Sequence, residues 1–207
     1  MGALYRRSTI TLAISALIPM PAAIAGQSDE DVRAPFGLTW GLSADEIRKL
    51  GVRLSASTGQ STYGVSFTAT DLSKVITDTE SVALFFGYRD KLWRIAAIGR
   101  SIGPDPSGGQ IVARYQDLAA VLSERYGRGV ETDIRDHEMW KGPNEYVMSL
   151  KVGRAFRYTN FHTPNVDVEL SVRAVTNDTA YYLILFEYRP GAREFEADKK
   201  IHEKDAL

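Results

Sequence analysis

The sequence predicts an α+β fold in which helices pack against an antiparallel sheet. Apolar residues recur at helical spacing from Ile111 to Tyr126, which indicates an amphipathic helix. Apolar and polar residues alternate from Val166 to Ala174, which is typical of a strand with one buried face. Because helices and strands come in runs rather than in strict alternation, we expect antiparallel pairing and no helical crossovers between parallel strands.

The first helix has a clear start and stop. A short strand is predicted over residues 36–41, followed directly by a helix. Ser43 and Glu46 have the spacing of a capping box, in which each side chain bonds the other residue's amide. Gly51 is expected to end this helix. Helix capping accounts for Ser43 better than a nucleophilic role, and the sequence predicts no catalytic residue.

The remaining elements follow from turn residues and alternation. In the first half, we expect a loop over residues 54–63, a strand over 63–70 and an antiparallel hairpin over 81–102. In the second half, a charged loop over 128–137, a short strand over 138–141, a strand over 156–163 and a hairpin of 166–174 with 180–188 are predicted. Residues 143–153 favour a short helix, although their apolar centre also suits a strand.

This order suggests two quasi-repeated halves, each a helix followed by strands and an apolar hairpin. The predicted organisation is a signal peptide at residues 1–25, a flexible leader at 26–34, a single domain at 35–190 with possible halves 35–102 and 107–190, and a charged tail at 191–207. The tail is expected to be either a frayed helix or disordered.

The first residues have the pattern of a secretory signal peptide. Arg6 and Arg7 precede a short apolar region, and small residues lead to a cleavage site after Ala25. Thr9 favours ordinary secretion over the twin-arginine route. We therefore expect a periplasmic or secreted protein.

Composition narrows the class of partner. The chain has no cysteine, so neither a disulfide nor an acylated cysteine is expected. Its formal net charge of −1 disfavours a nucleic-acid partner, which normally binds a basic face. No transmembrane segment is predicted after the signal peptide. A protein or envelope partner is expected, and the oligomeric state stays open.

The stretch Phe36-Gly37-Leu38-Thr39-Trp40-Gly41-Leu42-Ser43-Ala44-Asp45-Glu46-Ile47 resembles the opening of uncharacterised secreted or periplasmic proteins of Gram-negative bacteria. The helix-then-hairpin unit is also loosely similar to the small outer-membrane assembly lipoproteins and to the proteinaceous β-lactamase inhibitors. Those lipoproteins carry an acylated cysteine that this chain lacks. The resemblance implies a binding or accessory protein rather than an enzyme.

Few residues suggest chemistry. Asp136, His137 and Glu138 offer carboxylate and imidazole ligands for a divalent cation, and His162 is a further weak candidate. No second histidine completes a zinc pattern, so a solvated acidic loop is the preferred interpretation, and no cofactor is expected.

The hairpins carry more apolar residues than one buried face needs. We predict a second apolar face, for which the candidate binding residues are Phe85, Trp93, Ile95, Tyr182 and Phe186. Either other parts of the chain cover this face, which we favour, or part of it docks a partner. The leading hypothesis is therefore a secreted, non-enzymatic protein that binds an envelope component or an enzyme it restrains. The alternative is a metal-dependent hydrolase using residues 136–138.

Overall fold

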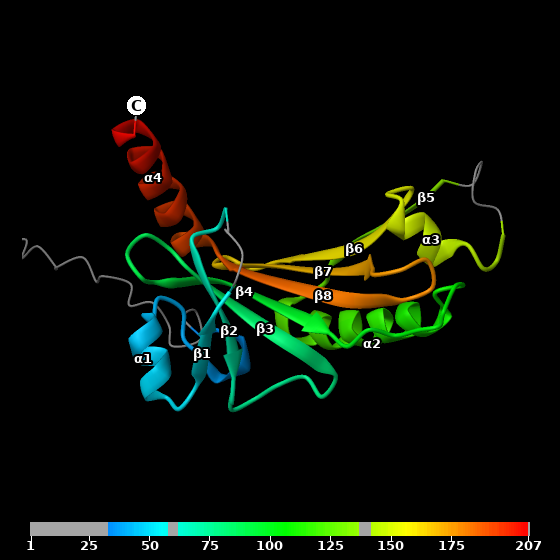
Figure 1. The fold of residues 1–207 in the computed structure, drawn as a ribbon, viewed down its shortest axis with the longest axis horizontal. Coiled ribbons are helices and arrows are strands. Elements are labelled where there is room, and N and C mark those ends of the chain that lie inside the picture. Colours follow the sequence, from blue (N-terminus) through cyan, green and yellow to red (C-terminus); the bar gives the residue numbers. More distant parts are fainter. Residues whose placement is uncertain (1–32, 58–61, 137–141, 207) are drawn as a thin grey trace, which may run out of the picture.

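The computed structural model describes residues 33–57, 62–136 and 142–206 of the chain. Within them, eight strands form one antiparallel sheet in the order β1-β2-β3-β4-β8-β7-β6-β5 (Figure 1). The strands are β1 (Arg53–Ala56), β2 (Val65–Thr70), β3 (Thr79–Phe86), β4 (Leu92–Gly99), β5 (Val130–Arg135), β6 (Ala155–His162), β7 (Val166–Ala174) and β8 (Ala180–Tyr188). The helices are η1 (Pro35–Gly37), α1 (Ala44–Lys49), α2 (Gly109–Tyr126), α3 (Tyr146–Lys151) and α4 (Arg189–Asp205). The predicted α+β class with an antiparallel sheet is confirmed.

The chain enters the fold through a tight turn, so the strand predicted over residues 36–41 is wrong. Phe36 and Gly37 both have positive φ, and the turn brings Arg33 opposite Thr39 as an isolated bridge. This geometry puts the Phe36 ring edge-on against Phe186, with ring centroids 6.0 Å apart. Ala34 lies in the predicted flexible leader, but it is buried in the core.

Helix α1 begins and ends as the sequence predicts. The Ser43 hydroxyl accepts from the Glu46 amide at 3.3 Å, and the Ser43 amide donates to the Glu46 carboxylate at 2.8 Å. Gly51 follows the helix with φ of +88°, a conformation that glycine adopts readily. The reciprocal capping box is confirmed.

Four strands in a meander follow α1. The predicted hairpin is β3 with β4, and the strand predicted over residues 63–70 is β2. The loop predicted over 54–63 is partly wrong, because β1 pairs with β2 in register Arg53↔Thr70 to Ala56↔Phe67. This edge strand is mostly exposed, and its sequence does not alternate between apolar and polar residues. Its strand conformation therefore depends on pairing with β2 and cannot be recognised from the sequence pattern.

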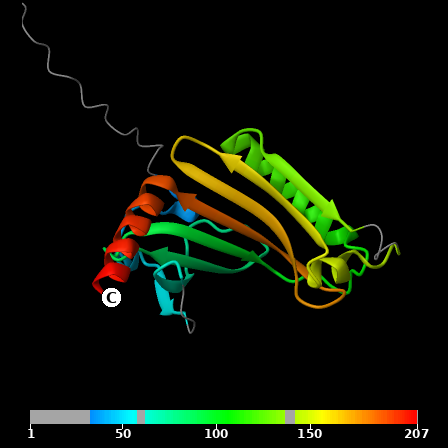
Figure 2. The ribbon, with the colours of Figure 1, turned by 90° about the horizontal axis from the view of Figure 1, so that it is seen from above.

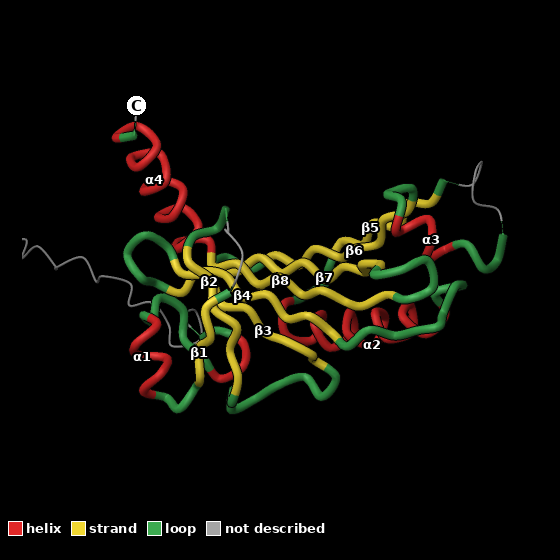
Figure 3. The backbone as a smooth tube through the Cα atoms, in the orientation of Figure 1, coloured by secondary structure: helices red, strands yellow, loops and turns green. Residues whose placement is uncertain are grey.

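The long helix α2 covers one face of the sheet, as Figures 1 and 3 show. Its residues Ile111, Tyr115, Leu118 and Leu122 are buried, and it ends before Gly127 as predicted. The residue before the helix, Gly108, has no side chain to cap it. The buried carboxylate of Asp105 replaces that cap by accepting from the amides of Gln110 and Ile111 at 2.9 and 3.1 Å.

The second meander, β5 to β8, fits the predicted strands except at its start. The charged loop predicted over residues 128–137 is wrong, because β5 pairs with β6 from Val130↔Asn160 to Arg135↔Ala155. The charged residues of β5 face α2, where Glu131 and Asp133 hold the largely buried Arg157. The helix favoured for residues 143–153 is α3, and the strand predicted over 138–141 lies outside the described residues.

The charged tail forms helix α4, which resolves the two alternatives in favour of a helix. Pro190 in its first turn is compatible with a helix start. Phe195 is the buried anchor of α4 and stacks on Trp93, with ring centroids 4.7 Å apart. Helix α4 stands on the side of the sheet opposite α2 (Figure 1).

One cluster of buried residues joins the sheet to α1, α2 and α3, and Phe195 of α4 does not belong to it. At its margin, the Arg114 guanidinium of α2 donates to both carboxylate oxygens of Asp78 at 2.6 and 2.8 Å. The Tyr182 hydroxyl donates to the same carboxylate at 3.0 Å. This ion pair lowers the pKa of Asp78, chiefly through the hydrogen bonds from Arg114.

Candidate binding surface

The face of the sheet opposite α2, which we call the open face, is the best candidate binding surface. Figure 2 looks onto this side, where the strands lie open and α4 lies across one end. Across the sheet, Ile98 of β4 pairs with Leu183 of β8, Leu183 with Ser171 of β7, and Ser171 with Tyr158 of β6. Residues paired in this way project to the same side of a sheet.

In this row the apolar residues Ile98 and Leu183, which we call the apolar row, are partly buried, whereas Ser171 is buried. Ile98 and Leu183 remain partly accessible, as does Leu185 in the neighbouring row. Towards the β5 edge, the exposed apolar side chains Ile134 and Phe156 pair with each other, with 52% and 46% of their surface accessible. A surface with apolar groups at its centre and edge therefore lies outside the main core.

Two of the predicted binding residues, Phe85 and Trp93, are on the open face. Between Phe85↔Arg94 and Phe86↔Leu92 the pairing of β3 with β4 shifts by one residue, and Trp93 is the extra residue. This bulge turns the indole away from the core and towards α4. Because Phe195 stacks on it, Trp93 is only 3% exposed and is not free to bind a partner.

The other three predicted binding residues are on the covered face, which corrects their placement. Ile95 pairs with Leu84 on one side and with Phe186 on the other, and all three belong to the main core. Tyr182 is on the same face of β8 as Phe186 and is fully buried. Their burial under α2 agrees with the favoured alternative of internal packing.

Leu183 and Leu185 are not among the binding residues predicted from the sequence. Strand β8 reads Ala-Tyr-Tyr-Leu-Ile-Leu-Phe-Glu-Tyr and is apolar on both faces, so its pattern does not indicate which face is buried. The pairing of Ile184 with Ala97 assigns Ile184 to the core and its two leucine neighbours to the open face. The one available signal was the surplus of apolar residues itself.

A charged row closes the open face at the end near α4. Arg94 faces Glu187 at 3.4 Å, and partial burial raises the pKa of Glu187. Arg189 donates to both oxygens of Asp167 at 2.6 and 2.8 Å, and His162 Nδ1 lies 2.6 Å from Asp167. Partial burial acts to raise the pKa of Asp167, but the hydrogen bonds from Arg189 and His162 outweigh it and lower that pKa.

The candidate metal ligands do not come together among the described residues. Asp136 directly follows Arg135, which pairs with Ala155 at the start of β6. His162 lies at the opposite end of the same strand. Seven residue steps along a strand span about 23 Å, too far for one ion. His137 and Glu138 lie outside the described residues, within which no group of three or more potential ligands could hold a metal ion.

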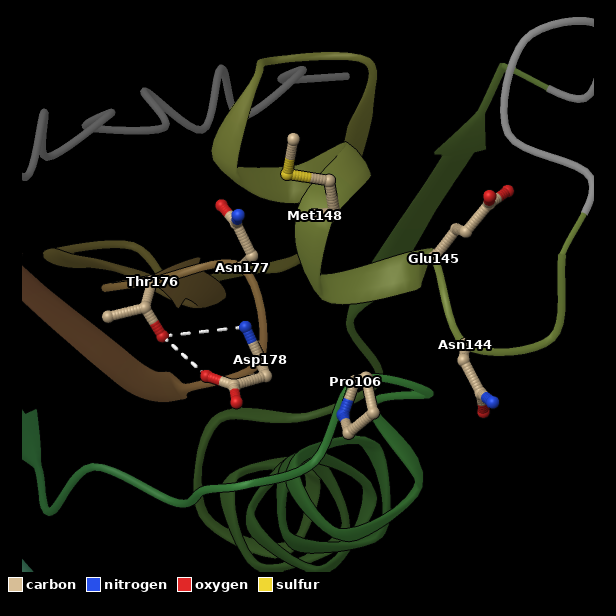
Figure 4. Close-up of a pocket in the computed structure, with 7 residues that line it drawn as sticks. All are labelled: Pro106, Asn144, Glu145, Met148, Thr176, Asn177 and Asp178. Atoms are coloured by element: carbon tan, nitrogen blue, oxygen red, sulfur yellow. Dashed lines mark hydrogen bonds between the residues drawn. The ribbon is translucent and has the colours of Figure 1, made fainter.

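A shallow pocket of about 610 Å³ lies between α3 and the β7–β8 turn (Figure 4). Two of its polar side chains bond each other: the Thr176 hydroxyl donates to Asp178 at 2.7 Å, as the dashed line in Figure 4 shows. The Glu145 carboxylate points away from these two residues and accepts from the Gly142 amide. The bonds among Thr176, Asp178 and Thr179 stabilise the β7–β8 turn.

None of the helices in the described part of the chain is both long and apolar enough to cross a membrane. No family model, curated protein or solved structure matches this chain.

Proposed function

We propose that this protein is an exported, non-enzymatic binding or accessory protein that holds another macromolecule against the open face of its sheet. The observation that carries the proposal is the apolar row of Ile98 and Leu183, which lies on the face of the sheet opposite α2 and is partly accessible. Accessible apolar surface of this kind on a water-soluble fold marks interaction sites.

The chemistry of the open face supports a macromolecular partner over a small substrate. Aliphatic and aromatic groups lie on a broad sheet surface, and its charged groups are paired, Glu169 with Arg173 on β7 and the remaining pairs at the end near α4. Apolar centres with polar margins are typical of protein–protein interfaces. The charged row would then set the orientation of the partner, while the apolar row contributes most of the affinity.

Export through a cleaved signal peptide is part of the same proposal and depends on the sequence alone. The basic start, the short apolar region and the small residues before Ala25 support it. The envelope or extracellular space would then be where the partner is met.

We also propose that the two halves are quasi-repeats. In support, each half begins with a helix and continues with four strands, although α3 is inserted between β5 and β6 in the second half. The strand order runs inward from both edges of the sheet, so that β4 and β8 are neighbours at its centre. Superposing α1–β4 on α2–β8 tests this, and helices that fall on opposite faces of the superposed sheets would contradict it.

Site-specific photo-crosslinking in producing cells tests the binding function. A photoreactive residue at Leu183 should give one discrete crosslinked product, whereas the same residue at Glu124, exposed on α2, should not. Leu185→Arg should reduce that product at least tenfold, because it puts a charge into the apolar interface.

The fold must be intact for this result to count. The urea midpoint of Leu185→Arg serves as the check, since an unfolded variant would also lose the product. Trp93→Ala is unsuitable as a binding variant because Trp93 packs under α4. Equal products from both crosslinking positions, or an unchanged product in folded Leu185→Arg, would refute the open face as the binding surface.

A further inference from the structure

A second hollow lies on the covered side of the sheet, away from the open face. This groove has a volume of about 1070 Å³ and runs between the entry segment around η1, the loop at residues 74–76, the last turns of α2 and the β6–β7 turn. Its size is slightly above the range, about 300–1,000 Å³, that is typical of small-molecule sites.

The floor of the groove is aromatic. Phe186 lies between Phe36, at 6.0 Å, and Tyr126, at 6.1 Å, measured between ring centroids. Burial raises the pKa of the Tyr126 hydroxyl, which favours its neutral form. At the rim, Val75 and Val121 are 50% and 62% exposed, which leaves apolar surface accessible on both sides of the groove.

The charge of the groove is one-sided. Arg33, Lys74 and Arg125 all line it, and none of the described residues that line it carries a carboxylate. None of these three cations forms an ion pair with a described residue, although the chain as a whole has a formal net charge of −1. The carbonyl end of α2 is partly negative, and Arg125 in its last turn offsets that charge.

From this combination we propose that the groove binds a single-chain anionic amphiphile, a long-chain fatty carboxylate. The acyl chain lies on Phe36, Tyr126 and Phe186, and the carboxylate is held by the cations at the rim. A cationic amphiphile would meet three like charges, none of which is paired with a described carboxylate. A neutral one would gain the apolar floor but leave the cations without a partner. Charge complementarity therefore selects the anion.

The test is displacement of a dansyl-labelled undecanoate probe from the purified full chain by dodecanoate, followed by fluorescence. We expect saturable binding of one carboxylate per chain. Affinity should rise by up to about fourfold for each methylene added between octanoate and dodecanoate, because each buried methylene contributes about 0.8 kcal/mol. Dodecyltrimethylammonium should displace the probe at least tenfold less well, and added salt should weaken binding of the carboxylate.

Charge reversal locates the site. Lys74→Glu combined with Arg125→Glu should weaken dodecanoate binding at least tenfold. Arg128→Glu is the matched control, since Arg128 is an exposed arginine just beyond α2 that does not line the groove, and it should change affinity less than twofold. Unchanged urea midpoints in all variants exclude unfolding as the cause.

Three outcomes would overturn the proposal. The first is absence of saturable binding by the wild-type chain. The second is equal displacement by the cationic and anionic amphiphiles, or equal effects of the groove and control variants. The third is binding that is seen only after Asp29, Glu30 and Asp31 are neutralised to their amides, because the acidic sequence that precedes Arg33 would then be the occupant of the groove.

Discussion

Gly99→Ala should strongly destabilise the protein, because the site of the added methyl group is already filled. Gly99 ends β4 on the covered face of the sheet, opposite the ring of Tyr182. A Cβ atom at this position would lie within 2.6 Å of the Tyr182 carbons Cδ1, Cε1 and Cζ. Real contacts to Cβ atoms are longer than this, so either the ring or the strand must shift.

The Tyr182 ring has little freedom to move. It is fully buried, and its hydroxyl lies 3.0 Å from Asp78 and 3.2 Å from the Thr79 hydroxyl. Overpacking a core costs about 1–3 kcal/mol. Losing a hydrogen bond to a charged group costs about 1.5–3 kcal/mol more if the ring swings away. We therefore expect the free energy of unfolding to fall by about 3 kcal/mol.

Urea unfolding measures this change. With a slope m of about 2 kcal/mol/M, the midpoint should fall by about 1.5 M at unchanged m. Gly87→Ala is the matched control, because the nearest side-chain atoms to its added Cβ, in Phe195 and Trp93, are 3.7 and 3.8 Å away. It should alter stability by less than about 1 kcal/mol.

A double-mutant cycle isolates the ring contact. In a Tyr182→Leu background, the clash is removed, and Gly99→Ala should cost at least about 1 kcal/mol less than in the wild type. A Gly99→Ala variant as stable as wild type, or the same cost in both backgrounds, would show that Tyr182 does not pack against Gly99. The assignment of Tyr182 to the core would then be wrong.

Two further predictions concern carboxylates that tie α2 to the rest of the fold. Hydrogen bonds from Arg114 lower the pKa of Asp78 in the folded state. The ionised Asp78 carboxylate therefore stabilises the fold fully above its ordinary pKa of 3.8. This stabilisation is lost as the pH falls through the lowered pKa of the folded state. Asp78→Asn should therefore be less stable than wild type at pH 7, with the difference shrinking below pH 3.8 in urea titrations; a gap independent of pH would contradict this. Asp105→Ala should reduce the free energy of unfolding by about 1–3 kcal/mol, because the amides of Gln110 and Ile111 lose their acceptor. Asp105→Asn, which keeps one oxygen, should lose less in the same assay, and equal losses would argue against a capping role.

Much of the local structure could be predicted because it depends on neighbours in the chain. The capping box of Ser43 and Glu46, the end of α2 at Gly127 and the alternation of β7 all involve residues within a few positions of one another. Their geometry is set by backbone hydrogen bonding and side-chain period, which the sequence displays directly.

The edge strands needed long-range contacts to be recognised. Strand β5 alternates Val130, Thr132 and Ile134 with charged residues, a pattern that suggests the apolar set is buried. The reverse holds: Val130 and Ile134 are exposed, and Glu131 faces the covered side. The reason is Arg157, whose buried charge requires carboxylate partners beneath α2.

The two candidate binding surfaces also depend partly on the sequence and partly on the tertiary structure. The sequence by itself determined that the β3–β4 and β7–β8 hairpins carry more apolar residues than a single buried face can use. Only the tertiary structure decided which of these apolar residues lie outside the core. A strand that is apolar on both faces does not indicate by its sequence which face will be buried. Pairing of β4 with β8 assigned Ile95, Tyr182 and Phe186 to the core and Leu183 to the open face. The groove around Phe36 likewise exists only where four segments distant in sequence meet.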